Sequence, residues 1–106
     1  MAYYLAVDGG TESLRARIYD DRGTALASHA EPYATDFSSG ARAEQNPEDW
    51  WTSLTKATRA CLAQAGLTGD EVAAMAYATT SCTVVALDGD HRPLRLAIIW
   101  MDVRAS

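Results

Sequence analysis

Residues that could bind a phosphate group gather in one short turn near the start of the chain. Asp8 precedes the pair Gly9 and Gly10, and the hydroxyls of Thr11 and Ser13 follow. Amide N–H groups beside glycine and hydroxyl donors suit phosphate oxygens, and an adjacent carboxylate suits a hydrated Mg²⁺ ion. An Asp-Gly turn between two strands is also common without any ligand. These residues alone therefore leave a phosphate and metal site and a plain turn as equal alternatives.

The turn joins two runs in which apolar and polar side chains alternate. This alternation over residues 4–20 predicts a β-hairpin, in which we expect the two glycines to adopt a positive φ. A turn at 20–23 and a third strand at 24–30 extend the hairpin into a three-stranded antiparallel meander. A loop is predicted over 31–44, and a loop of this length in a small domain is often functional.

Residues 47–65 carry the signs of a helix that packs on this sheet. Asn46 can cap its first turn, and Gly66 can end it. Apolar residues at helical spacing form one stripe that contains Trp50, Leu54, Ala57 and Cys61. We expect Trp50 and Trp51 to be core anchors, because adjacent helix positions point about 100° apart and at most one could line a given pocket.

The second half of the sequence predicts a parallel strand, a polar segment and a hairpin. The small residues of 72–78 suit a buried strand parallel to the first, reached by a right-handed crossover through the helix. Thr79–Thr83 then lies where open α/β sheets place ligands, although a simple connection to the next strand is the better explanation of this segment taken by itself. Strands are predicted at 84–87 and 94–100, joined by a turn at 88–93. In the second strand we expect Leu96 and Ile98 to point toward the core, which places Trp100 on the same side.

Length and composition describe one small globular unit. The chain has 106 residues, a hydrophobic content of 48 % and a net charge of -5, without a cluster of Lys and Arg, which argues against a nucleic-acid partner. No apolar run approaches the ~20 residues of a membrane span and the N-terminus lacks a basic signal region, so we expect a cytoplasmic protein without a membrane partner. Cys61 and Cys82 lack metal-ligand spacing, and we expect both to be buried free thiols.

Four segments together resemble the amino-terminal part of the FGGY carbohydrate kinases. In the order and spacing of that family, they are DGGTESLR at 8–15, EQNPEDWW at 44–51, LDGDHRPL at 87–94 and IWMDVR at 99–104. The resemblance covers nearly the whole chain. Residues 79–83 further resemble the ribulokinase-like members, which points toward a pentulose such as ribulose or a related polyol as the substrate.

This resemblance implies an α/β fold of the actin-like, ribonuclease-H-like type. Residues 1–106 would form part of the N-terminal domain of a sugar kinase, with a phosphate-binding hairpin at 4–20 and sugar-side segments at 79–83 and 99–104. It also implies transfer of a phosphoryl group from ATP to a sugar hydroxyl with the help of Mg²⁺. The general base and the adenine site are expected beyond Ser106, and the resemblance allows a homodimer of the full-length enzyme.

The implied site has a phosphate side and a sugar side. The residues that would position the phosphate and its metal ion are Asp8, Gly9, Gly10, Thr11, Ser13 and Arg15, with Asp8 at the metal. The residues that would bind a small-molecule sugar or polyol are Thr80, Ser81, Trp100, Asp102 and Arg104. Phosphoryl transfer depends on positioning and charge neutralisation, which donors, a cation and a carboxylate can supply.

Two other functions fit the same sequence. The chain could be a non-catalytic actin-like module that binds a nucleotide phosphate or a protein partner through the hairpin. It could also be a structural domain whose Asp-Gly turn binds nothing. The sugar-side residues favour the kinase, because a nucleotide sensor would not require them.

Overall fold

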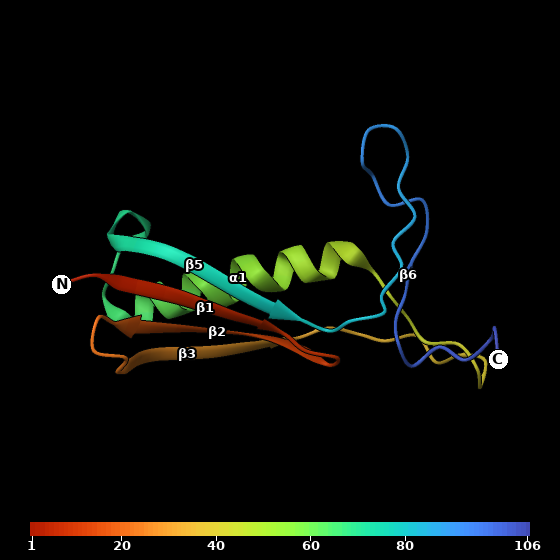
Figure 1. Cartoon of the computed structure of the whole chain (residues 1–106), viewed down its shortest axis with the longest axis horizontal. Helices are drawn as coiled ribbons and strands as arrows, with labels where there is room; N and C mark the ends of the chain where they lie inside the picture. The colour runs from red at the N-terminus through yellow and green to blue at the C-terminus, as the bar shows by residue number, and fades with distance from the viewer.

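The computed structural model describes residues 1–106 as a four-stranded sheet with one long helix across one face (Figure 1). Strands β1 (Tyr3–Gly9), β2 (Ser13–Asp20) and β3 (Ala25–Pro32) form the antiparallel meander. Strand β5 (Val72–Thr79) pairs with β1 in parallel, which gives the order β3-β2-β1-β5. The predicted α/β class, the meander and the parallel direction of the strand after the helix are confirmed. The expectation that this strand is buried is wrong, because β5 lies at the edge of the sheet and nearly all its residues are exposed.

Helix α1 (Pro47–Ala65) begins and ends where its capping residues predict. The Asn46 side chain accepts a hydrogen bond of 3.1 Å from the amide of Glu48, and Gly66 closes the last turn with a φ of 68°. The helix packs across β2 and β3. Side chains that point from the sheet toward the helix form the core with two helix residues: Leu5, Val7, Leu14, Ala16, Ile18, Ala27, Ala57 and Cys61.

A second, smaller layer lies beyond the carboxyl ends of β1 and β5 (Figure 1). It consists of β4 (Glu44–Gln45) and β6 (Ala97–Ile98), which pair in antiparallel fashion. The predicted strand at 94–100 is present only as the two residues of β6, and the predicted strand at 84–87 is wrong, because Val84 and Leu87 form only isolated bridges. The chain does reverse at the predicted turn, but Val84 bridges to Ile98, which also pairs with β4, and no continuous ladder forms between the two predicted strands.

The register expected for the returning strand is also wrong. Alternation with Leu96 and Ile98 inward would have directed Trp100 inward too, whereas Ala97 and Ile99 are the buried residues. Pairing with β4 sets this register, because the amide of Ile99 donates to the carbonyl oxygen of Ala43 at 3.1 Å. Trp100 is consequently exposed over 54 % of its surface.

The two glycines of the first turn serve a different purpose from the one predicted. Neither has a positive φ, which among the glycines occurs at Gly23 and Gly66 alone. They instead allow neighbouring atoms to lie close to the backbone of the turn. A Cβ on Gly9 would lie 3.2 Å from Cγ2 of Thr79, and one on Gly10 would lie 3.1 Å from the carbonyl oxygen of Ser13.

Two further expectations about burial are corrected. Cys61 is a buried free thiol as predicted, but Cys82 is exposed, in an irregular segment where it adopts a φ of 57°. Trp51 is exposed over 67 % of its surface and is not a core anchor in this chain. Trp50 is half-buried and lines one apolar groove together with Trp51, so the expectation that at most one of them could line a given pocket is also wrong.

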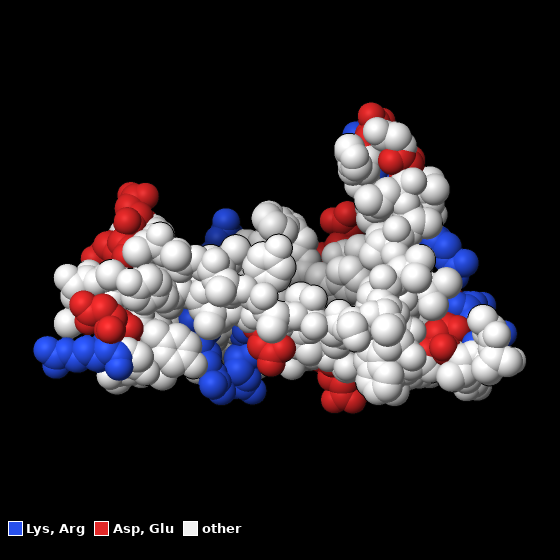
Figure 2. Space-filling model, viewed as in Figure 1, with Lys and Arg blue, Asp and Glu red and all other residues white.

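The surface has little charge over the middle of one broad face. Figure 2 shows acidic and basic side chains mainly at the two ends of the molecule and along one edge of this face. Strand β5 lies at the edge of the sheet with β1 as its single neighbour. The one helix of the α type does not combine the length and apolar content that crossing a membrane requires.

Candidate functional site

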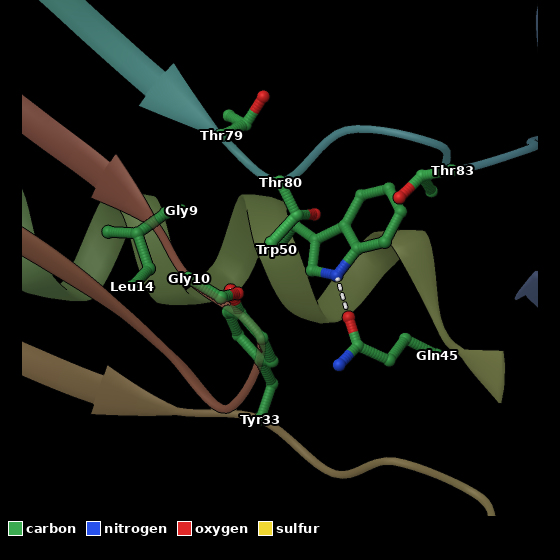
Figure 3. A pocket seen from close by; sticks show the side chains of 9 residues that line it. All are labelled: Gly9, Gly10, Leu14, Tyr33, Gln45, Trp50, Thr79, Thr80 and Thr83. Atoms are coloured by element: carbon green, nitrogen blue, oxygen red, sulfur yellow. Dashed lines mark hydrogen bonds between the residues drawn. The ribbon is translucent and has the colours of Figure 1, made fainter. Parts of the chain in front are cut away.

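A cavity of about 180 Å³ opens at the carboxyl ends of β1 and β5, between the first turn and the start of α1 (Figure 3). Its lining consists of Gly9, Gly10, Leu14, Tyr33, Gln45, Trp50, Thr79, Thr80 and Thr83. None of these side chains carries a charge at neutral pH. The cavity therefore offers hydroxyl and amide groups beside one indole ring, a set that suits a small uncharged ligand with several hydroxyls.

Gln45 fixes one wall of this cavity. Its Nε2 donates to the carbonyl oxygen of Thr11 at 2.6 Å and to the hydroxyl of Thr35 at 2.8 Å. Its Oε1 accepts from Nε1 of Trp50 at 2.9 Å, the bond drawn in Figure 3. Because both ends of the amide are engaged, the orientation of Gln45 and of the indole ring is set before any ligand binds.

Tyr33 lies in the loop that follows β3 and forms hydrogen bonds to the first turn. Its hydroxyl donates to the carbonyl oxygens of Gly10 and Ser13, the latter at 3.1 Å. Burial raises the pKa of Tyr33, and the negative charge of Asp8 acts in the same direction. The phenol is therefore a neutral donor at physiological pH. In the sequence, the length of the loop is the one sign that this segment has a role.

The threonines supply the polar groups of the opposite wall. The amide of Thr80 donates to the carbonyl oxygen of Gly9 at 3.2 Å, which keeps the segment close to the turn after β5 ends. The Oγ1 atom of Thr83 is buried and has no hydrogen-bond partner within the chain. Since an unpaired buried hydroxyl costs about 1–3 kcal/mol, a ligand hydroxyl at this position would restore the missing bond.

The predicted phosphate residues lie around one turn but on two faces of the sheet. Gly9 and Gly10 line the cavity on the helix side. Asp8 and Arg15 are directly opposite each other in the β1–β2 register and line a shallow hollow on the other face. By alternation along β2, Ser13 belongs to that same face.

The predicted sugar residues are more widely distributed. Thr80 lines the cavity, whereas Ser81 is exposed outside the lining. The Nε1 atom of Trp100 donates to the Thr11 hydroxyl at 3.0 Å, so the indole lies against the turn. Asp102 and Arg104 form an ion pair of 2.7 Å, and the Arg104 guanidinium holds the pKa of Asp102 well below its usual range.

Asp8 is the acidic residue at which the sequence predicts a metal ion. No group of three or more His, Cys, Asp or Glu side chains is arranged to hold one. Magnesium is commonly held by one or two carboxylates together with phosphate oxygens and water. Asp8 is exposed beside the turn and fits that arrangement.

Comparison with known proteins agrees with this architecture. Residues 3–106 match the N-terminal domain of the FGGY family of carbohydrate kinases. The chain is 34 % identical over its whole length to a glycerol kinase from Rhodopseudomonas palustris, of which it covers 21 %. It is 35 % identical, over 96 % of its length, to a xylulose kinase from Streptomyces rubiginosus, of which it covers 20 %.

A solved structure shows the same fold. The ligand-bound xylulose kinase from Lactobacillus acidophilus superimposes with a TM-score of 0.88 at 22 % identity, over 96 % of this chain and 20 % of that one. The fold is thus that of the N-terminal domain of a carbohydrate kinase. The chain belongs to the FGGY family, whose kinases use ATP, and spans about a fifth of the length of these relatives.

Proposed function

We propose that this chain is the phosphate- and polyol-binding part of a kinase that transfers a phosphoryl group from ATP to a hydroxyl of a small uncharged polyol or ketose. The observation that carries this proposal is the position of the neutral cavity directly beside the glycine turn. A hydroxyl bound in the cavity and a phosphate bound at the turn would be neighbours. Membership of the FGGY family supports the same reaction.

The turn would act as the phosphate side of the site. Gly9 and Gly10 allow the backbone to approach a phosphate closely, and the hydroxyls of Thr11 and Ser13 are nearby donors. Arg15 would contribute positive charge from the outer face of β2. Asp8 would hold Mg²⁺ through one carboxylate, and the ion, when bound, would neutralise charge on the phosphate oxygens.

The cavity would act as the polyol side. Thr80 and Thr83 offer hydroxyls, Tyr33 and Gln45 shape the wall, and Trp50 presents an apolar ring. Ser81, Trp100, Asp102 and Arg104 remain predicted sugar residues that lie outside this lining. Tyr33 is the one lining residue that titrates, and its raised pKa makes it unsuitable as a general base. We therefore place the general base in the remainder of the protein.

The substrate class follows from the neutral lining and from the relatives. Relatives of similar identity are described as glycerol kinase and as xylulose kinase. We propose a polyol or ketose of three to five carbons, with a pentulose such as xylulose or ribulose as the first choice. A sugar acid would place a carboxylate among groups that carry no positive charge, which is unfavourable.

A substrate panel with the full-length enzyme tests this proposal. ADP release is followed with ATP, Mg²⁺ and one of glycerol, xylulose, ribulose or gluconate. We expect at least one uncharged substrate to give a kcat/KM ~100-fold above that of gluconate, a difference of about 2.7 kcal/mol. Absence of ADP release with every polyol and ketose tried, or a preference for gluconate, would refute it.

A further inference from the structure

Glu44 is a buried carboxylate surrounded by three arginines from separate parts of the chain. Its surface is 3 % exposed. Its Oε2 accepts from Nη2 of Arg104 at 2.6 Å and also from Nη2 of Arg95. Nη1 of Arg42 lies 3.9 Å from its Oε1. One side chain therefore joins β4 to residues on both sides of β6.

Backbone hydrogen bonds reinforce this junction along residues 97–104, which we call the Trp100 segment. The amide of Val103 donates to the carbonyl oxygen of Ala41 at 3.0 Å. In the other direction, the amide of Ala43 donates to the Asp102 carboxylate at 2.8 Å. Arg104 bridges Asp102 and Glu44, so the carboxylates at the two sides of the junction share one guanidinium.

The two chain segments that Glu44 joins converge on the same residue of the first turn. Trp100, from the Trp100 segment, donates to the hydroxyl of Thr11 at 3.0 Å. Gln45, next to Glu44 in β4, donates to the carbonyl oxygen of Thr11 at 2.6 Å. Thr11 follows directly after the glycines that line the cavity, so its position depends on how β4 and the Trp100 segment fit together.

We propose that Glu44 is a positioning residue for phosphoryl transfer, which acts through Trp100 and Gln45 on the turn that contains Thr11. This inference rests on the proposed function. Neutralising Glu44 leaves guanidinium groups facing one another without their common counter-charge, and the loss of one partner from a buried ionic cluster is strongly unfavourable. The Trp100 segment would shift, and the turn would lose its fixed geometry.

Steady-state kinetics of the full-length enzyme test the inference with Glu44→Gln. A displacement of about 1 Å in a positioning group can cost about 100-fold in rate. We expect kcat to fall by about 10- to 100-fold, a larger factor than any rise in the KM for the polyol, because the substitution displaces groups but removes none of the lining residues. An unchanged kcat in a folded Glu44→Gln enzyme would overturn the proposal.

Asp36→Asn is the matched control. Asp36 lies at the edge of the same cluster, 3.6 Å from Nη1 of Arg42, but makes no side-chain bond to the Trp100 segment. Asp36→Asn removes one negative charge, as Glu44→Gln does. Its kcat should stay within about twofold of wild type, because Thr11 keeps both its partners. Equal loss in the two variants would show a general effect of charge and would overturn the proposal.

A double-variant cycle separates positioning from stability. Trp100→Phe removes the indole N–H that holds Thr11, and its kcat should fall as well. If Glu44 acts through Trp100, the double variant should be no slower than the slower single variant within about twofold, whereas independent effects would multiply. The indole N–H resonance of Trp100 should also move in Glu44→Gln and stay in place in Asp36→Asn.

A milder variant keeps the test decisive if Glu44→Gln does not fold. Arg95→Met removes one of the two closest partners of Glu44 from a half-exposed position. It should lower kcat by about 3- to 10-fold and shift the Trp100 indole resonance in the same direction. A folded Arg95→Met enzyme with wild-type kcat and an unmoved resonance would overturn the inference. If the inference about Glu44 is overturned but the enzyme still releases ADP in the presence of a polyol, the proposed function is not contradicted.

Discussion

At the scale of single residues, the two adjacent glycines of the first turn face different neighbours. A methyl group on Gly9 would meet the end of the Thr79 side chain, whereas one on Gly10 would meet the backbone carbonyl of Ser13. Side chains can turn aside more easily than a turn carbonyl that also accepts from the Gly10 amide at 2.9 Å. Close approach, rather than a positive φ, is therefore the reason for glycine here.

This difference predicts unequal effects of alanine at the two positions. Gly9→Ala should change the free energy of unfolding by less than about 1 kcal/mol, because crowding is offset by the lower entropy of the unfolded chain. Gly10→Ala should destabilise by about 1–3 kcal/mol, the usual cost of overpacking. Urea unfolding of the full-length variants measures both values. A larger loss for Gly9→Ala than for Gly10→Ala would contradict this account.

Tyr33 allows a prediction about alkaline pH. A group whose pKa is raised by folding stabilises the fold fully below its ordinary pKa, about 10 for tyrosine, and this contribution is lost as pH rises through the folded value. Tyr33→Phe should cost about 1 kcal/mol at pH 8, the typical value of a hydrogen bond. The difference from wild type should shrink as the pH rises above about 10. Unfolding free energies measured from pH 8 to 11 would show a constant difference if Tyr33 did not titrate in this way.

Some residues of the site could be predicted from the sequence, and others could not. The Asp-Gly-Gly turn and Thr80 could be found because their chemistry lies within one short segment. Tyr33 and Gln45 were missed, because their roles depend on contacts with a turn that lies 20 or more residues earlier in the chain. Trp100 is a predicted sugar residue, but its bond to Thr11 spans 89 residues and no local pattern predicts it.

At the scale of elements, strong local signals gave correct predictions and weak ones did not. The meander and α1 carry alternation, caps and an apolar stripe within their own residues, so each could be predicted by itself. Residues 84–100 alternate as a hairpin would, but Ala97 and Ile98 pair with β4, which precedes them by about fifty residues. The partner of a strand is a property of the whole fold, and alternation alone does not reveal it.

The cap of α1 gives a direct test at this scale. Asn46→Ala removes the acceptor for the Glu48 amide and should lower the free energy of unfolding by about 1 kcal/mol. Asn46→Ser, which supplies another good capping oxygen, should retain most of that stability. Both values come from the same urea titration. Equal losses in the two variants would mean that Asn46 acts by some contact other than the cap.

The junction between β4 and the Trp100 segment should weaken in acid. The Arg104 guanidinium lowers the pKa of both Glu44 and Asp102. Carboxylates of this kind stabilise the fold fully above their ordinary pKa of about 4, and the contribution is lost as pH falls through the folded values. The unfolding free energy of wild type should therefore fall more steeply below about pH 4 than that of Glu44→Gln. Parallel curves would contradict this coupling.

At the scale of the whole molecule, one flank is apolar and unpartnered. Strand β5 has a free edge, and 52 % of Met75 and 72 % of Tyr77 are exposed. Beside them lies a groove of about 360 Å³, lined by Val7, Gly9, Leu14, Pro47, Trp50, Trp51, Leu54, Met75, Tyr77 and Thr79. Exposed strand edges and apolar patches favour association. We expect other parts of a full-length kinase to cover this flank.

The isolated 106-residue chain should therefore self-associate, and sedimentation velocity measures this directly. Tyr77→Lys places a charge on the free edge of β5 and should move the distribution toward monomer, because a charged edge strand resists pairing with another chain. Tyr4→Lys is the matched control, since it makes the same change at an exposed tyrosine of β1, an inner strand of the sheet. A stable wild-type monomer at high concentration would contradict this prediction, because it would show that the exposed apolar flank does not cause association. Equal dispersal by both variants would place the association elsewhere on the molecule.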